Sequence, residues 1–350
     1  MAFNCRVVRA CSQFLYIVQI FFYTVFQNYF IAETDIMTIT RISKKIMAAC
    51  LGLGLLASLP AAADDLDVLG QFLEQNFPTQ DDPLGAFALQ NPAGQIEAQA
   101  AMAGPLLTSQ SALIVNNRTG EVLFQKNPNR VMPIASISKL MSAIVVLDAG
   151  QSMNERITIT DAEIDRLKGT GSRLSIGTTL TRSELLHLSL MSSENRATHA
   201  LGRNYPGGMS AFVEAMNRKA QSLGMSNSRF YEPTGLDFRN VSTASDLNKL
   251  VQAASRYPLI SRNSTSNYGS VYTSNGRQQS YKNSNALVRE GGWNIELQKT
   301  GYIREAGRSM VVKASVQNQP VTIVLLNSPS SLSRVNDARK IESWMLQHPS

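Results

Sequence analysis

Cysteine is scarce in this chain and is confined to its beginning. The three cysteines are Cys5, Cys11 and Cys50, and none follows Cys50 in the sequence. A disulfide framework is therefore excluded for the greater part of the chain. A long segment without thiols also suits an oxidising compartment, where stray cysteines would be oxidised.

Histidine is equally scarce, with only His187, His199 and His348. Their wide spacing does not fit a zinc site, and we expect neither a metal nor another cofactor. The count of residues alone leaves a Ser-His-Asp triad open. However, no Gly-x-Ser-x-Gly segment occurs, so the strand-to-helix turn that carries the nucleophile of α/β-hydrolases is not predicted.

Blocks of Lys and Arg with interleaved aromatic residues are also missing. The formal net charge of +7 falls to +4 beyond residue 63, because residues 1–63 hold five Lys or Arg and two acidic residues. We therefore expect no nucleic-acid partner. A mildly basic surface is compatible with an acidic polymer, although it is also typical of an ordinary solvated surface.

Residues 37–63 have the three parts of a secretory signal peptide. Met37 begins a short basic segment that ends at Lys45, the apolar run 46–59 follows, and three alanines end the segment at Ala63. The apolar run is too short to span a membrane comfortably, and small residues are typical of a cleavage site. We therefore predict cleavage near Ala63 and a periplasmic location.

Residues 1–36 do not fit this scheme. They contain an aromatic-rich apolar stretch, 14–32, which Gln19, Gln27 and Asn28 interrupt. The stretch can be interpreted as a membrane span, but we prefer to place the true start at Met37. Residues 1–36 are then a misassigned upstream extension.

Three short motifs follow one another along the chain: Ser136-Ile-Ser-Lys139, Ser193-Glu-Asn195 and Lys299-Thr-Gly301. A hydroxyl three residues ahead of a lysine, on the first turn of a helix, places an attacking oxygen beside a nitrogen that can accept its proton. The other two motifs can supply a proton relay and a cationic wall for an anionic acyl substrate. Each motif is weak alone, since Ser-x-Asn also occurs at 152–154 and 261–263.

The sequence pattern places strands at both ends of the region 108–350 and helices between them. We predict a hairpin over 112–124, a buried helix after Pro133 that ends near Gly150, and a mainly helical region over 161–257, with helices at 185–203 and 209–223. Strands follow at 296–302, 310–316 and 321–327, and a helix at 337–347. The pattern indicates an α/β (α+β) fold, with an antiparallel sheet flanked by helices and an inserted helical lobe. Residues 64–107 are interpreted as a leader or linker.

The three motifs together resemble those of the penicillin-binding serine D-Ala-D-Ala peptidases, most closely the small D-alanyl-D-alanine endopeptidases, over about residues 111–347. Further support comes from Pro233-Thr-Gly-Leu-Asp237 and from Tyr302 after the third motif. The resemblance implies a β-lactamase/transpeptidase-like fold. One departure is Glu194, where the pattern has Asp.

The resemblance also implies roles for individual residues. Ser136 would be the nucleophile, Lys139 its base, and Ser193 the hydroxyl that passes a proton to the departing amine. The residues implied to bind substrate are Asn195, Lys299, Thr300, Gly301 and Tyr302. The N–H groups of Ser136 and Tyr302 would form the oxyanion hole. A lysine base must be neutral, and both burial and a nearby cation such as Lys299 lower a lysine pKa.

The resemblance leaves several activities open. The first is an endopeptidase that cuts D-Ala-diaminopimelate cross-links in peptidoglycan, with β-lactams as covalent inhibitors. The larger carboxypeptidases of the family generally add a β-rich domain and a membrane anchor after the catalytic domain, so the short segment after Gly301 favours the endopeptidase over a carboxypeptidase. A β-lactamase would need a carboxylate such as Glu232 to activate water. A non-catalytic penicillin sensor would need a signalling segment, which only residues 1–36 could provide.

Overall fold

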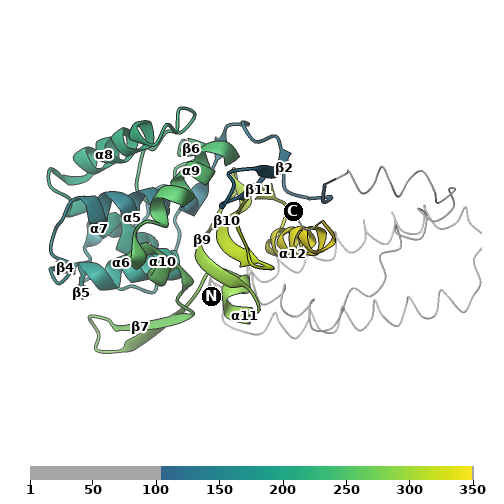
Figure 1. The fold of residues 1–350 in the computed structure, drawn as a ribbon. Helices are drawn as coiled ribbons and strands as arrows, with labels where there is room; N and C mark the ends of the chain where they lie inside the picture. The colour runs from purple at the N-terminus through teal and green to yellow at the C-terminus, as the bar shows by residue number, and fades with distance from the viewer. Residues whose placement is uncertain (1–103, 349–350) are drawn as a thin grey trace, which may run out of the picture. The chain divides into compact units, whose positions relative to one another are not determined.

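The structure, a computed structural model, describes residues 104–348. The predicted upstream extension, the signal peptide and residues 64–103 of the predicted leader lie outside the described residues. The described part contains a five-stranded sheet with helices on both of its faces (Figure 1). Between residues 104 and 348, no helix is long and apolar enough to cross a membrane.

The sheet joins the two ends of the described chain, as predicted. Its strands run antiparallel in the order β2-β1-β11-β10-β9. The strands are β1 (Ser111–Asn116), β2 (Val122–Lys126), β9 (Asn294–Ile303), β10 (Gly307–Val316) and β11 (Gln319–Ser328). Because β1 pairs with β11, the first hairpin and the last three strands form one sheet. Strand β9 lies at an edge.

Both faces of the sheet are covered by helices. Successive side chains of β1 show this, because they point alternately into the cores on the two faces. All six β1 residues are buried. Leu113 and Val115 belong to the core shared with the helical lobe, whereas Ala112 and Ile114 belong to the core under the last helix, α12 (Ser331–Gln347). Helix α12 starts six residues before the predicted helix, at an N-cap in which the Ser330 hydroxyl accepts from the Ser333 N–H at 2.9 Å.

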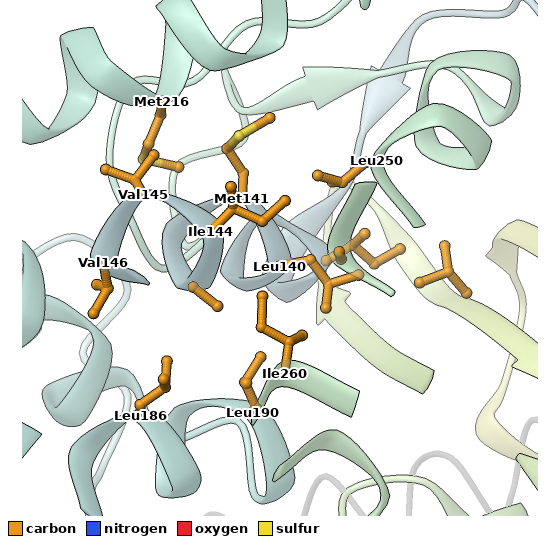
Figure 2. Close-up of a cluster of buried hydrophobic side chains, with 14 of the residues drawn as sticks. Leu140, Met141, Ile144, Val145, Val146, Leu186, Leu190, Met216, Leu250 and Ile260 are labelled. Carbon is orange, nitrogen blue, oxygen red and sulfur yellow. The ribbon is translucent and has the colours of Figure 1, made fainter. Parts of the chain in front are cut away.

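The helical lobe is built around the helix that the apolar stripe after Pro133 predicts. The helix is α5 (Ser138–Asp148), and residues 138–146 are all buried. Figure 2 shows its apolar side chains pointing in several directions, with Val145 beside Met216 and Leu140 beside Ile260. A helix that contacts protein on all sides is fixed firmly. The first turn of α5 is therefore a rigid platform.

Further helices and three pairs of short strands complete the described chain. The helices are η2 (Ala135–Ile137), η3 (Asp161–Glu163), α6 (Arg182–Met191), α7 (Asn195–Arg203), α8 (Gly208–Ser222), α9 (Ala244–Ala254), α10 (Pro258–Thr265) and α11 (Ala286–Glu290). Three pairs of short strands are β3 (Met132–Pro133) with β6 (Val241–Ser242), β4 (Arg156–Thr158) with β5 (Thr179–Thr181), and β7 (Tyr268–Tyr272) with β8 (Gln278–Lys282). The sequence pattern did not predict these strand pairs.

The prediction of one helix over 185–203 was wrong, because the chain breaks between α6 and α7. Ser192 turns its hydroxyl back to the Leu188 carbonyl at 2.9 Å, and Ser193 has a φ of 64°. Glu194 then caps α7 with its side chain. Side chains that hydrogen-bond the local backbone compete with the helix, which ends α6 and starts α7. The second motif occupies this break.

Candidate active site

The serine of the first motif lies on a strained turn just ahead of α5. Ser136 is the middle residue of η2, and Ala135 before it has a φ of 47°. This conformation costs a non-glycine residue about 1–3 kcal/mol, and it persists only when its surroundings hold it. Here the Ser138 hydroxyl donates to the Ala135 carbonyl at 2.8 Å, and the Asn240 amide donates to Ser138 Oγ at 3.1 Å. The turn thus fixes the direction of the Ser136 side chain.

Lys139 connects this turn to two other segments. Its Nζ lies 2.9 Å from Ser136 Oγ, 2.8 Å from Asn195 Oδ1 and 2.7 Å from the Thr234 carbonyl oxygen. A neutral amine has two N–H donors and one lone pair. With the two N–H groups donated to Asn195 and Thr234, the lone pair remains for the hydroxyl proton of Ser136. This arrangement suits a base.

The ionisation of Lys139 fits the same role. The side chain is fully buried, and burial lowers the pKa of Lys139 to about 8. The carboxylates of Glu232 and Glu194 oppose this effect by favouring the charged amine. A pKa of about 8 leaves about a tenth of Lys139 neutral at pH 7, a useful fraction for a base.

A second lysine and serine form a parallel pair beside the first. Lys299 Nζ lies 2.9 Å from Ser193 Oγ and 2.9 Å from the Thr300 carbonyl oxygen. Burial lowers the pKa of Lys299 well below its usual range, and the positive charges of Lys139 and Arg334 add to the effect. From the sequence we expected a cation to act on Lys139. In the structure, burial is the main cause of the lowered pKa of Lys139. Repulsion from neighbouring positive charges instead contributes to the lowered pKa of Lys299.

The third motif brings the edge strand β9 against the serine turn. A Cβ placed on Gly301 would lie 2.9 Å from the Ile134 carbonyl oxygen and 3.1 Å from the Ser136 nitrogen. Glycine is required for an approach this close. The backbone of the third motif therefore meets the backbone of Ser136, where the two N–H groups of an oxyanion hole are expected.

The neighbours of Gly301 on β9 have different surroundings. Thr300 is buried, and its hydroxyl lies 2.8 Å from that of Ser284. Tyr302 is half-exposed, and the guanidinium of Arg308 lies 3.6 Å from the centre of its ring, a cation-π contact. The eight sequence-predicted site residues thus gather where η2, the start of α7 and β9 meet.

Comparison with known proteins gives the family. Residues 97–330 match the family model described as D-alanyl-D-alanine carboxypeptidase. The chain belongs to this family. It is 43% identical over 240 residues to the D-alanyl-D-alanine endopeptidase of Pseudomonas aeruginosa PAO1, covering 68% of this chain and 77% of that protein. It is also 43% identical over 242 residues to the D-alanyl-D-alanine endopeptidase of Escherichia coli K12, covering 69% and 78%.

The fold of a D,D-peptidase is also shown by a solved structure. The DD-transpeptidase of Streptomyces K15 matches with a TM-score of 0.65 and 26% identity, covering 70% of this chain and all of that one. The β-lactamase/transpeptidase-like fold is therefore confirmed. The chain is a serine hydrolase of the D-Ala-D-Ala peptidase type.

The departure at Glu194 has a simple explanation in this D,D-peptidase. Its carboxylate hydrogen-bonds neither lysine: Oε1 accepts from the Ser172 hydroxyl at 2.7 Å and from the Arg196 N–H at 3.2 Å. The side chain caps α7 and anchors a neighbouring loop. The middle residue of the second motif is therefore structural, and a longer carboxylate is accommodated.

Glu232 also has a structural place. Its Oε2 accepts from the Thr234 N–H at 2.7 Å and from the Thr234 hydroxyl, and its Oε1 accepts from the Gly235 N–H. These bonds shape the loop that presents the Thr234 carbonyl to Lys139. Through this loop, Glu232 helps to hold Lys139 in place. Both of its carboxylate oxygens accept hydrogen bonds from the loop, so the carboxylate is not free to activate water.

Sequence reasoning missed three groups of the site. The Thr234 carbonyl belongs to the Pro233-Thr-Gly segment, which supported the family resemblance. From the sequence, this segment had no role assigned to it. Ser284 and Arg334 gave no signal. Ser284 lies in a loop after β8, and Arg334 comes from the first turn of α12, where it is buried and donates to the Ser309 carbonyl at 3.2 Å.

Proposed function

We propose that this D,D-peptidase is an endopeptidase that cuts D-Ala-diaminopimelate cross-links in peptidoglycan through an acyl-enzyme on Ser136. The observation that carries the proposal is the 43% identity to two proteins named D-alanyl-D-alanine endopeptidase, over more than three quarters of each. D,D-carboxypeptidase activity is the second candidate, because the family model carries that description.

Acylation follows from the contacts of Ser136 and Lys139. Neutral Lys139 takes the hydroxyl proton as Ser136 Oγ forms a bond to the D-Ala carbonyl carbon. Negative charge develops on the carbonyl oxygen, next to the backbone N–H groups of Ser136 and Tyr302. Donors placed in advance at this position lower the barrier most, because no reorganisation is needed during the reaction.

The leaving amine needs the proton that Lys139 has taken. The Ser193 hydroxyl lies 2.9 Å from Lys299 Nζ. We assign the transfer to Ser193: its hydroxyl donates a proton to the amine as the C–N bond breaks and is reprotonated through the lysines. Water then attacks the ester, gives a proton back to Ser136 by way of Lys139, and releases the D-Ala carboxylate.

Lys299 and Thr300 lie on the side of the site that binds the leaving group. A cross-link has a carboxylate on the carbon next to the scissile amide nitrogen. Lys299 in its protonated form attracts this carboxylate, and the hydroxyl of Thr300 donates to it. The same arrangement would accept the carboxylate of a β-lactam, so we expect β-lactams to acylate Ser136.

The predicted signal peptide supports a periplasmic site of action, where peptidoglycan is accessible. Fractionation of cells that produce the full chain tests this location. The mature form is expected in the periplasmic fraction, with an N-terminus near residue 64. Retention of residues 1–36 in the isolated protein would contradict it.

The activity is tested with purified cross-linked muropeptide dimers and with pentapeptide monomers. Conversion of dimers to monomers identifies an endopeptidase, whereas release of terminal D-Ala alone identifies a carboxypeptidase. Ser255→Ala is a matched control for Ser136→Ala, because Ser255 Oγ also lies near a lysine, 3.2 Å from Lys313 Nζ, but outside the site. Only the Ser136 variant should lose activity.

A further inference from the structure

An exposed ion pair links two segments at the rim of the site. Lys168 Nζ lies 2.5 Å from Glu305 Oε1, and the two side chains are 27% and 37% exposed. Lys168 belongs to the loop between η3 and β5, and Glu305 to the turn between β9 and β10. The mechanism proposed above uses neither residue.

The loop around Lys168 is ordered by its own hydrogen bonds and is attached to the site. The carboxylate of Asp165 accepts from the N–H groups of Lys168 and Thr170, at 3.0 and 2.9 Å. The Thr170 hydroxyl lies 3.5 Å from Asn195 Nδ2. Lys168 is thus held near Asn195.

The turn around Glu305 is attached to the other side of the site. Glu305 follows Gly301 by four residues, and Ile303 and Ala306 pack with Ala135 of the serine turn. The edge strand β9 therefore runs from Lys299, past Ser136, to the ion pair. At about 3.4 Å per strand residue, Gly301 and Glu305 are at most about 14 Å apart, a distance that a long side chain of a peptide bound alongside can help to cover.

The direction of the substrate follows from the chemistry at the other end of β9. Ser193, Lys299 and Thr300 mark the side of the leaving amine. The acyl half of the substrate must leave Ser136 in the opposite direction, along Gly301 to Ile303. An extended peptide that adds to this strand edge carries the residues before the scissile D-alanine toward Lys168 and Glu305.

The residue before that D-alanine in the proposed substrate is a diaminopimelate. Its side chain ends in an amino-acid group, with one ammonium and one carboxylate. We propose that the Lys168–Glu305 ion pair is a specificity site that recognises this group, with Glu305 binding the ammonium and Lys168 the carboxylate. The inference rests on the proposed function and names the stem peptide on the acyl side of the bond.

The charges around the pair suit a zwitterion better than a simple anion or cation. The positive charge of Lys168 helps to lower the pKa of Asp237. The positive charge of Arg304 likewise helps to lower the pKa of Glu305. Asp237 itself is paired with Arg239. The rim therefore offers both signs of charge side by side.

The test uses synthetic peptide dimers that share one acceptor stem and differ only in the third residue of the donor stem. One donor has diaminopimelate, and the other has lysine, which keeps the ammonium and lacks the distal carboxylate. The wild-type protein should prefer the diaminopimelate donor in kcat/KM by roughly 2- to 5-fold, the effect expected of one partly exposed charge pair.

Two variants separate recognition from simple bridging of the loops. In Lys168→Gln, the ratio of the two donors should fall to about one. The double variant K168E/E305K keeps an ion pair between the loops but reverses its polarity, and the ratio should fall there too. The control is the exchange E290R/R339E, which reverses a more exposed pair between α11 and α12 with an N···O distance of 3.0 Å. It should keep the wild-type ratio.

The outcomes are distinct. A wild-type ratio near one, or a ratio that K168E/E305K preserves, overturns the inference. Loss of penicillin acylation in K168E/E305K equal to the loss of dimer cleavage also overturns it, because penicillin has no diaminopimelate and the pair would then only support the loops. If the wild-type protein cleaves no dimer, the endopeptidase proposal fails. The same two third residues in pentapeptides then decide the inference.

Discussion

Gly301 lies so close to Ser136 that a Cβ at Gly301 would stand 3.1 Å from the Ser136 nitrogen. The contact joins the sheet to the helical lobe at the backbone of the nucleophilic serine. In addition, it places the backbone donors of β9 next to those of the serine turn. The third motif thus needs glycine at this position, because a residue with a Cβ could not approach Ser136 so closely.

Gly301→Ala should therefore impair acylation while leaving the fold intact. The added methyl group would press on the Ile134 carbonyl oxygen at 2.9 Å and on the Ala135 side chain at 3.2 Å, so β9 must move away from Ser136. A displacement of about 1 Å at a reacting group costs on the order of 10²-fold in rate. Stopped-time labelling with fluorescent penicillin measures the loss, and circular dichroism checks the fold. Labelling at the wild-type rate would show that the approach is not needed.

The pH dependence of acylation should follow Lys139. The amine must be neutral to accept a proton, and burial lowers its pKa to about 8. Acylation by penicillin at low concentration should therefore rise as the pH increases through about 8 and level off above it, since the free enzyme titrates. The second-order acylation rate between about pH 6 and pH 9.5 tests this. A flat profile across this interval contradicts the assignment of Lys139 as the base.

Lys139→Arg should lose nearly all acylation although the positive charge is kept. A guanidinium does not deprotonate in a protein and cannot accept the Ser136 proton. Because the site is fully buried, Lys139→Met is a useful second variant that removes the amine without adding bulk. Lys313→Arg, at the Lys313–Ser255 pair outside the site, is the matched control and should acylate normally. Acylation by the Lys139→Arg variant near the wild-type rate would make Lys139 an electrostatic residue only.

Penicillin should label Ser136 and no other serine. Ser255 tests the importance of context, because it also lies near a lysine but lacks the strained turn and the β9 edge. Ser136→Ala should abolish labelling, and Ser255→Ala should leave it unchanged. Mapping of the labelled peptide by mass spectrometry decides between them. A label on a serine outside the first motif would overturn the proposed mechanism.

The sequence predicted the outline of the fold because its main strands are short, mostly apolar runs that are buried on both faces of the sheet. Strands β9, β10 and β11 lie within two or three residues of the predicted ranges, and the apolar stripe of α5 correctly predicted a buried helix. The break at Ser193 escaped prediction, since the apolar spacing continues across it. The break depends on hydrogen bonds of Ser192 and Glu194 that periodicity does not record.

The site was predictable where its residues form local motifs and unpredictable where they come from distant segments. Ser136 and Lys139 are three residues apart on one turn, so their contact follows from helix geometry. The charge of Arg334 acts on the pKa of Lys299 only because α12 packs against the sheet that carries Lys299. No pattern in the sequence around Arg334 predicts this position. Its placement needs the tertiary structure.

The last prediction concerns Glu232, the residue that separates a D,D-peptidase from a β-lactamase. A deacylating base would make the wild-type protein release bound penicillin quickly, and Glu232→Gln would trap it, because general-base assistance is typically worth about 10²–10⁴ in rate. The structure instead assigns the Glu232 carboxylate to the backbone N–H groups of Thr234 and Gly235. Release of the label should therefore be slow in both proteins.

The glutamine should have a different effect, on stability and on Lys139. Its amide nitrogen cannot accept the hydrogen bonds that the second carboxylate oxygen accepts, and a buried donor left unsatisfied costs about 1–3 kcal/mol. Thermal unfolding should therefore occur at a lower temperature. Because the negative charge of Glu232 raises the pKa of Lys139, its removal should shift the acylation profile toward lower pH. Rapid release by the wild-type protein that disappears in Glu232→Gln, without a change in thermal stability, would show that Glu232 is a deacylating base.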